Sequence, residues 1–200
     1  FSDTPAWKCA QAQLLAHMRG FAPLIALQIE YSLLERTVEG ELVPMAQELG
    51  LGITPWAPLK AGVLSGKYRR GQTPEAGGRS AGKQLDERAY KVIDELDAIA
   101  KESNSTLSRV AIAWVRSRPG VTSPIVGART LAQLDDSLDA ANLTLSTEQI
   151  ARLDALTKPT LNFPHDFIQG SKAFSQGGTT INGVGSKVWP LSPQSDSERH

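Results

Sequence analysis

Three polar or aromatic side chains stand at the ends of short apolar runs, where a ligand could reach them. Gln28 ends the first run, Trp56 follows the second, and Arg129 lies three residues after the third. A side-chain amide can pair with a carboxamide, an aromatic face can stack on a flat ring, and a guanidinium can donate two hydrogen bonds to a phosphate. Ligands of parallel α/β sheets bind at the carboxyl ends of the strands, so these positions are the candidate site.

The third position has the most informative surroundings. Gly127 lets a ligand approach the backbone, and Thr130 with Gln133 three residues later is typical of a capping box at a helix start. The backbone N–H groups at such a start attract anions, and Arg129 adds a donor for a phosphate or a plane for a base. The alternative is an ordinary strand-to-helix turn that carries a surface arginine.

The other candidates have structural alternatives as well. Trp56 could pack under a loop instead of stacking on a ligand, and Gln28 could be a buried glutamine whose partners lie within the protein. We interpret Tyr31 as structural or as part of a pocket wall. His165 has no orienting partner in its sequence neighbourhood, so we expect it in a loop rather than in catalysis.

The elements that must position these residues alternate between helix and short apolar strand. Continuous apolar strands that alternate with helices are typical of a parallel sheet covered by helices. We therefore predict an α/β fold with about three parallel strands, too few for a closed eight-stranded barrel, and a mostly irregular tail from Pro159 onward. The apolar face of the first helix is predicted to include Trp7, Leu14, Leu15 and Met18. The expected helices cover 4–18, 41–49, 86–103, 106–118, 130–140 and 146–156, the strands 23–29, 51–55 and 121–126, and a long loop 60–84.

Composition narrows the class of protein. Among the 200 residues, 21 Lys and Arg balance 21 Asp and Glu, so we expect neither nucleic acid nor an anionic membrane as partner. No apolar run is long enough to span a membrane, no basic-then-apolar leader is visible, and no metal site is predicted. The lone Cys9 is predicted to be a small core residue of a cytoplasmic protein. The first residue is Phe1 rather than Met, which suggests a piece of a longer protein.

Four stretches match one known family in order and spacing. They are Ser2–Asp3, QIEYSLLER from Gln28 to Arg36, TPWAPLKAGVLSGKY from Thr54 to Tyr68, and SPIVGARTLAQLDDSL from Ser123 to Leu138. Together they resemble the aldo-keto reductase family, which implies a (β/α)8 TIM barrel. Residues 1–158 would form the C-terminal half of that barrel, a partial barrel, and residues 159–200 a tail. The resemblance also implies NADP(H) as cofactor and a small-molecule carbonyl compound as substrate.

The resemblance assigns many of these residues to a cofactor site. It places Ser2, Asp3 and Gln28 at the nicotinamide carboxamide, although Asp3 stands where the family more often has Asn. Trp56 falls on the aromatic residue that stacks under the nicotinamide ring. The remaining positions fall on the pyrophosphate loop (Ala57, Leu59, Gly62, Ser65 and Lys67) and on the adenosine 2′-phosphate and adenine site (Gly127, Arg129, Gln133, Asp136 and Ser137).

No residue of this chain is assigned to catalysis. The family transfers a hydride from NADPH to a carbonyl, with a tyrosine as proton donor supported by Lys, Asp and His, and these four lie before the matching stretch. The resemblance therefore predicts an NADP-dependent reductase of aldehydes or ketones in the parent protein and an inactive chain in the 200 residues alone. Four aromatic residues of the tail could line a substrate pocket or pack on the barrel wall, namely Phe163, Phe167, Phe174 and Trp189.

Two other classes of protein remain as alternatives. The chain could be a non-catalytic nucleotide-binding or interaction module that associates with itself through the open edges of its sheet. It could also be an unrelated parallel α/β protein whose strand ends match by chance. In that case Gln28, Trp56 and Arg129 would not line one groove.

Overall fold

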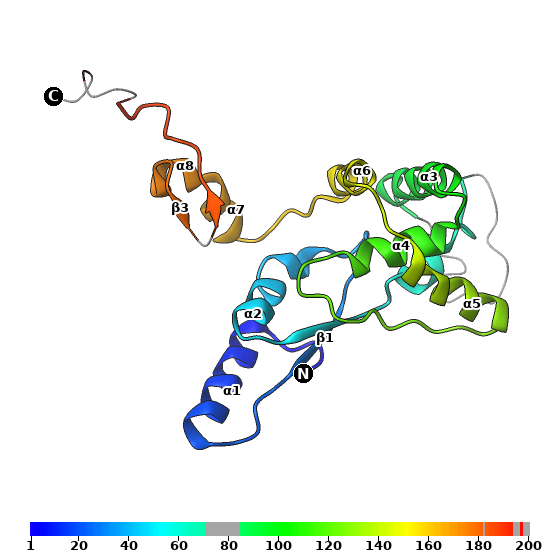
Figure 1. Ribbon diagram of the computed structural model, residues 1–200, viewed down its shortest axis with the longest axis horizontal. Helices are drawn as coiled ribbons and strands as arrows, with labels where there is room; N and C mark the ends of the chain where they lie inside the picture. Colours follow the sequence, from blue (N-terminus) through cyan, green and yellow to red (C-terminus); the bar gives the residue numbers. More distant parts are fainter. Residues whose placement is uncertain (71–84, 182, 194–196, 198–200) are drawn as a thin grey trace. The chain divides into compact units, whose positions relative to one another are not determined.

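The computed structural model describes residues 1–70, 85–181, 183–193 and 197 (Figure 1). The chain divides into two compact units, Phe1–Pro159 and Thr160–His200. Residues 71–84 of the predicted loop over 60–84 lie outside the described residues. Within the described ranges, no helix is both long enough and apolar enough to cross a membrane.

Two parallel strands form the centre of the first unit and confirm the predicted α/β class. Strand β1 (Ala26–Glu30) pairs with β2 (Gly52–Trp56), with Gln28 opposite Thr54 and Glu30 opposite Trp56. Successive side chains of a strand point to opposite faces. One face of this pair is therefore buried and apolar, and the other carries the polar and aromatic residues of the candidate site.

The buried face of the strands packs into the main core. Leu27, Ile29 and Ile53 are at most 1% exposed and belong to one apolar cluster with residues of the covering helices. On the opposite face Gln28 is exposed and Trp56 is half-buried. The alternative of a buried, internally satisfied Gln28 is wrong, because the residue lies on the uncovered face.

Two further segments run beside these strands. Along β1, the Gln28 N–H donates to the carbonyl of Phe1 at 2.7 Å, and the Gln28 carbonyl accepts from the Asp3 N–H at 3.1 Å. Along β2, the Ile53 N–H donates to the Gly120 carbonyl at 3.0 Å, and the Ile53 carbonyl accepts from Thr122 at 2.8 Å. The sheet therefore consists of four parallel segments, of which only the central two are regular strands.

The predicted third strand over 121–126 is only partly formed. It makes a single isolated bridge, between Ile53 and Val121, although Ile125 also donates to the Pro55 carbonyl at 2.7 Å. Ile53 and Pro55 present their backbone groups to this segment, and a proline has no N–H to donate. One hydrogen bond of the ladder is therefore missing where the strand was expected to continue.

Helices cover the buried face of the sheet and follow the predicted ranges closely. The capping residues predicted from sequence are present in α5 and α6, because the Thr130 and Ser146 hydroxyls accept from the backbone three residues later. The elements of the first unit besides the strands are α1 (Ala6–Arg19), η1 (Thr37–Glu39), α2 (Leu42–Glu48), η2 (Lys60–Ser65), α3 (Glu87–Glu102), α4 (Leu107–Arg116), α5 (Leu131–Asp139), η3 (Ala140–Asn142) and α6 (Thr147–Thr157).

The first helix buries a different face from the predicted one. The residues of α1 that enter the core are small, namely Ala6, Cys9 and Ala16. The large apolar residues expected on the buried face are exposed, with Trp7 at 61% and Met18 at 74%. Small residues allow close approach to the rest of the unit, and the wider stripe of large residues points away from it. The prediction for Cys9 is confirmed, since it is fully buried.

Helices α3, α4 and α6 lie close together in the first unit (Figure 1). Helix α3 contacts both α4 and α6, and α4 is buried from Val110 to Val115. The indole of Trp114 is fully buried at the centre of this group. Their side chains supply much of the main core.

The second unit contains more regular structure than the predicted irregular tail. It forms two short helices, α7 (His165–Gly170) and α8 (Lys172–Gln176), and a two-residue hairpin of β3 (Thr180–Ile181) and β4 (Val184–Gly185). The ring of Phe174 contacts that of Trp189 edge to face, and Phe163 contacts Phe167. The four aromatic residues of the tail therefore pair within this unit, and His165 begins a helix.

Candidate functional site

A groove with a volume of about 1620 Å³ lies at the carboxyl ends of the two strands. Its walls come from the end of β2, the segment that follows it, the start of α3, and the segment from Ile125 into α5. It brings together most of the residues predicted for a cofactor site. These are Trp56, Ala57, Leu59, Gly62, Ser65, Lys67, Gly127, Arg129, Gln133, Asp136 and Ser137.

Three predicted residues, Ser2, Asp3 and Gln28, lie outside the groove wall, and Asp3 among them contacts Trp56. Ser2 forms a parallel bridge with Gln28, and the Asp3 carboxylate accepts a hydrogen bond from the indole Nε1 of Trp56 at 2.9 Å. The Ser2 hydroxyl donates to the other carboxylate oxygen of Asp3 at 3.2 Å. Asp3 therefore orients the tryptophan ring at the strand end. This contact requires only a hydrogen-bond acceptor, so a carboxylate can make it as well as the amide of an asparagine.

The loop from Ala57 to Ser65 has an unusual backbone. Ala57, Lys60 and Ala61 have φ angles of 50°, 46° and 53°, in the left-handed region that side chains with a Cβ disfavour. Each such residue costs on the order of 1–3 kcal/mol and persists only where its surroundings hold it. The loop is held by a turn hydrogen bond from the Lys60 N–H to the Ala57 carbonyl at 2.8 Å and by the fully buried side chain of Leu64.

An ion pair crosses from this loop to the end of β1. The Lys60 Nζ lies 2.6 Å from Glu30 Oε1 and 3.8 Å from the carboxylate of Glu35. The Lys60 side chain is 32% exposed and both carboxylate side chains are 28% exposed. Neither Glu30 nor Lys60 stands out in the sequence, because charged residues are common at strand ends and in loops and 30 residues separate the two.

The start of α5 differs in detail from the predicted capping box. Thr130 accepts a hydrogen bond from the Gln133 N–H at 3.2 Å, as expected. The Gln133 side chain, however, accepts from the Arg129 N–H at 3.0 Å rather than from the capping residue itself. Only Ser146 and Gln149 of α6 form the complete reciprocal box. The Gln133 side chain therefore fixes the backbone of the residue that carries the exposed guanidinium.

Asp136 connects α5 to α4. Its carboxylate accepts from the Thr106 hydroxyl at 3.0 Å and pairs with the Arg109 guanidinium at 2.8 Å. Thr106 is itself the cap of α4, since its oxygen accepts from the Arg109 N–H. The neighbouring Ser137 is buried. These contacts fix the angle at which α5 begins and thus the position of the Arg129 side of the groove.

Gly127 leaves open space above the backbone. A Cβ added at this position would meet no heavy atom within 4 Å. Its φ angle is not positive, so the backbone conformation does not require glycine either. Among the described residues, no packing contact requires this glycine, so the backbone here is open to the close approach of a ligand.

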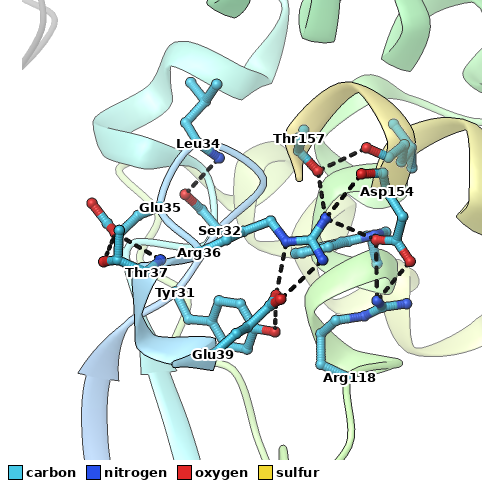
Figure 2. A network of polar contacts seen from close by, with 12 residues as sticks. Tyr31, Ser32, Leu34, Glu35, Arg36, Thr37, Glu39, Arg118, Asp154 and Thr157 are labelled. Atoms are coloured by element: carbon cyan, nitrogen blue, oxygen red, sulfur yellow. Dashed lines mark hydrogen bonds and ion pairs between the residues drawn. The ribbon is translucent and has the colours of Figure 1, made fainter. Parts of the chain in front are cut away.

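A buried polar network, which sequence analysis missed, supports the loop after β1. Figure 2 shows Arg36 at its centre, where the guanidinium pairs with Glu39 at 2.7 Å and with Asp154 at 3.0 Å and donates to the Thr157 hydroxyl at 2.7 Å. The Arg36 side chain is only 8% exposed. More than a hundred residues separate it from Asp154, so local patterns could not reveal the pair.

The same network encloses Trp114 and Tyr31. The guanidinium carbons of Arg36 and Arg118 lie 5.0 and 4.5 Å from the centre of the Trp114 ring, and Asp154 accepts from its Nε1. The Tyr31 hydroxyl donates to Glu39 at 2.7 Å (Figure 2). Burial, together with that carboxylate, raises the pKa of Tyr31 above its ordinary value. Tyr31 is thus a structural residue, as the sequence analysis expected.

The chain is similar to known proteins of one family, several of which are named as oxidoreductases. A sequence model described as the aldo/keto reductase family matches residues 1–158. The chain is 38% identical over 154 residues to an uncharacterized oxidoreductase of Bacillus subtilis, covering 76% of this chain and 46% of that protein. It is 29% identical over 192 residues to norsolorinic acid reductase of Aspergillus flavus, covering 96% and 47%.

A third relative extends the same pattern. The chain is 27% identical over 193 residues to a probable aryl-alcohol dehydrogenase of Saccharomyces cerevisiae, covering 94% of this chain and 58% of that protein. The chain spans about half the length of the curated relatives that it matches. The match to one family over most of the chain excludes a chance likeness to an unrelated α/β protein.

Proposed function

We propose the function that follows from the family of this chain, which belongs to the aldo/keto reductases. The groove binds NADP(H), with Trp56, Gln28 and the Ser2–Asp3 pair at the nicotinamide and the start of α5 at the adenosine phosphate. The nicotinamide supplies the hydride that reduces a carbonyl carbon. The whole protein reduces aldehydes or ketones, and aryl carbonyl compounds are the first substrates to test, because one relative is named an aryl-alcohol dehydrogenase.

The observation that carries the proposal is the lining of a single groove by Trp56 and Arg129. The half-buried indole offers a face to a flat ring, and the exposed guanidinium offers paired donors to a phosphate. Pockets for ordinary small molecules occupy about 300–1,000 Å³. The groove, at about 1620 Å³, has room for a longer ligand such as a dinucleotide. The open space above Gly127 fits a phosphate that approaches the backbone.

A titration tests whether the groove binds the cofactor. NADPH added to the 200-residue chain should quench the fluorescence of Trp56, and the Trp56→Phe variant should lose that component of the quenching. The Trp7→Phe variant is the matched control, because Trp7 is exposed on α1 and lies outside the groove. Absence of quenching by millimolar NADPH in the unmodified chain would contradict the proposal.

Preference for NADPH over NADH follows from Arg129 in this proposal. A guanidinium that meets a 2′-phosphate gives a charge-assisted pair that NADH cannot form. The Arg129→Met variant should therefore bind NADPH about tenfold more weakly, while its affinity for NADH stays unchanged. Equal losses for both cofactors would assign Arg129 to another part of the ligand or to the fold.

The chain by itself is proposed to be inactive. Tyr31 is 1% exposed and Tyr68 is 5% exposed, and Tyr90 packs under the guanidinium of Arg70. The Tyr31 hydroxyl donates to Glu39 rather than to a histidine. The purified chain should not oxidise NADPH in the presence of nitrobenzaldehyde, and measurable turnover would refute this part of the proposal.

A self-associating module is the second candidate function. The large apolar side chains on α1 favour it, because Leu14 and Leu15 are 60% and 49% exposed and Met18 more so. Exposed apolar stripes on a helix are typical of protein–protein contacts. In either case we place the protein in the cytoplasm, since its lone cysteine is buried and reduced, and we propose neither nucleic acid nor a membrane as partner.

A further inference from the structure

We propose that Glu30 and Lys60 are positioning residues that fasten the loop from Ala57 to Ser65 to the end of β1. The fastened loop forms one wall of the groove in the shape that receives a dinucleotide. The identity of the ligand rests on the proposed function, but the fastening is a property of the chain alone. It can therefore be measured with no ligand present.

The contact joins two walls of the groove, the end of β1 and the loop that follows β2. Lys60 Nζ lies 2.6 Å from Glu30 Oε1, and both residues line the groove. Glu30 is the last residue of β1 and stands opposite Trp56 in the strand register. The loop thus leaves the sheet at Trp56 and is tied back to it at Lys60, whose ion-pair partner Glu30 lies beside Trp56 on the neighbouring strand.

The backbone of the loop needs such a restraint. Lys60 and Ala61 have left-handed φ angles of 46° and 53°, and the turn at Gly62 has a φ of 91°. Without an external restraint, residues with a Cβ return to more favourable conformations. The neighbouring Leu59 packs against the main core, and Val63 is buried. A change of backbone conformation in this loop would therefore occur at the three residues between them, Lys60, Ala61 and Gly62.

Lys60 is better suited to fastening the loop than to binding a phosphate itself. Two carboxylates, those of Glu30 and Glu35, lie within 4.0 Å of its ammonium, so the trio carries a net negative charge. An anion that reached Lys60 would have to displace a carboxylate or lie beside one. Lys67 and Arg129 are further cations of the same groove wall.

Hydrogen–deuterium exchange of the full chain tests the proposal without cofactor. The informative amides are those of Lys60, Gly62 and Leu64, which donate to carbonyls within the loop. The Lys60→Met variant should speed their exchange about two- to fivefold, the range expected for a partly exposed ion pair. Lys60→Arg keeps the charge and should preserve the slow exchange. Lys101→Met is the matched control, because it removes an exposed lysine that pairs with Asp97 on α3.

The partner residue gives a second, independent arm. The Glu30→Gln variant should also speed exchange, and the Glu30→Gln/Lys60→Met double variant should exchange no faster than Lys60→Met alone. High salt should raise the exchange of the unmodified chain toward that of the variants and leave the variants unchanged. The unfolding free energy measured in urea should fall by no more than the equivalent of this fold-change, about 1 kcal/mol, so the variants stay folded while the loop opens more often.

The outcomes separate this inference from the cofactor proposal. Unchanged loop exchange in Lys60→Met, or additive effects of the two substitutions, would overturn the fastening whatever NADPH does. Faster exchange with no NADPH binding in the unmodified chain would support the fastening and overturn the proposed function. If both hold, the dissociation constant for NADPH should rise by the same two- to fivefold factor in Lys60→Met and stay unchanged in Lys60→Arg.

Discussion

The two glycines that flank the segment over 121–126 differ in what surrounds them. Gly120 has a φ of 81°, and a Cβ there would lie 3.2 Å from Gln47 and from Ile53. Gly127 has neither constraint, since no heavy atom comes within 4 Å of the added Cβ. The described part of the fold therefore constrains the first glycine and leaves the second unconstrained.

Substitution of Gly127 should therefore weaken binding without weakening the fold. The Gly127→Val variant should unfold at the same urea concentration as the unmodified chain and bind NADPH about tenfold more weakly, because its side chain occupies the space above the backbone. The comparison variant is Gly120→Ala, which should lose about 1–2 kcal/mol of unfolding free energy. Unimpaired NADPH binding by Gly127→Val would remove Gly127 from the site.

At this scale, sequence patterns predicted residue types better than contacts. Trp56 and Arg129 could be predicted to share a groove because the carboxyl ends of parallel strands meet at one edge. The bond from Asp3 to Trp56 could not, because 53 residues separate the two side chains. The Gln133 side chain was expected to pair with the helix cap, but the backbone N–H of Arg129 is the donor that it reaches.

At the scale of elements, Arg36 connects the segment after β1 to α6. Its guanidinium satisfies Glu39, Asp154 and Thr157 at once, so its removal leaves several polar groups without a partner in a largely buried place. We expect Arg36→Met to lower the unfolding free energy by about 3 kcal/mol, measured by urea unfolding. Arg152→Met, which breaks more exposed pairs with Glu95 and Glu102, should cost less than about 1 kcal/mol. Equal losses in the two variants would show that burial of the network matters little.

A second connection, between the segment after η2 and α3, depends on pH. Hydrogen bonds from Arg69 and then Lys101 lower the pKa of Asp97 from 3.8 to about 2. A carboxyl whose pKa is lower in the folded chain stabilises the fold above its unfolded pKa, and this contribution is lost as pH falls through the folded value. The loss therefore falls between about pH 4 and pH 2.

The Asp97→Asn variant tests that connection. Its unfolding free energy should fall less steeply over this pH window than that of the unmodified chain, because asparagine does not titrate. Urea unfolding at several pH values within the window measures the slope. Asp135→Asn, at an exposed position on α5, should leave the slope unchanged. A slope unaffected by Asp97→Asn would mean that the carboxyl is equally acidic in the unfolded chain.

The limits of sequence reasoning at this scale are physical as well. Helices α3 and α4 could be predicted closely because their apolar residues recur at helical spacing and their caps are the usual Asp and Thr. The buried face of α1 could not, because its small residues make the contacts and its large ones remain exposed. The third strand failed because the hydrogen bonds of a strand depend on its neighbour, and here the neighbour contains Pro55.

At the scale of the whole molecule, exposed apolar surface should govern behaviour in solution. Besides the α1 side chains, Phe21 and Ile25 are 61% and 78% exposed just before β1. We expect the chain to associate with itself, and light scattering after size-exclusion chromatography should give a mass above 21.5 kDa that rises with concentration. The Leu14→Gln/Met18→Gln variant should shift the mass toward the monomer. A stable monomer in the unmodified chain would argue against the second candidate function.

The missing N–H of Pro55 also has a thermodynamic consequence for binding. Trp56 is the last residue of β2, and Arg129 follows the segment over 121–126 that runs beside β2 with an incomplete set of hydrogen bonds. We therefore expect the span between the indole and the guanidinium, which one ligand must bridge, to vary in the unliganded chain. A ligand that reached both would remove this freedom, so its binding should show an entropic penalty that a ligand of half its length escapes.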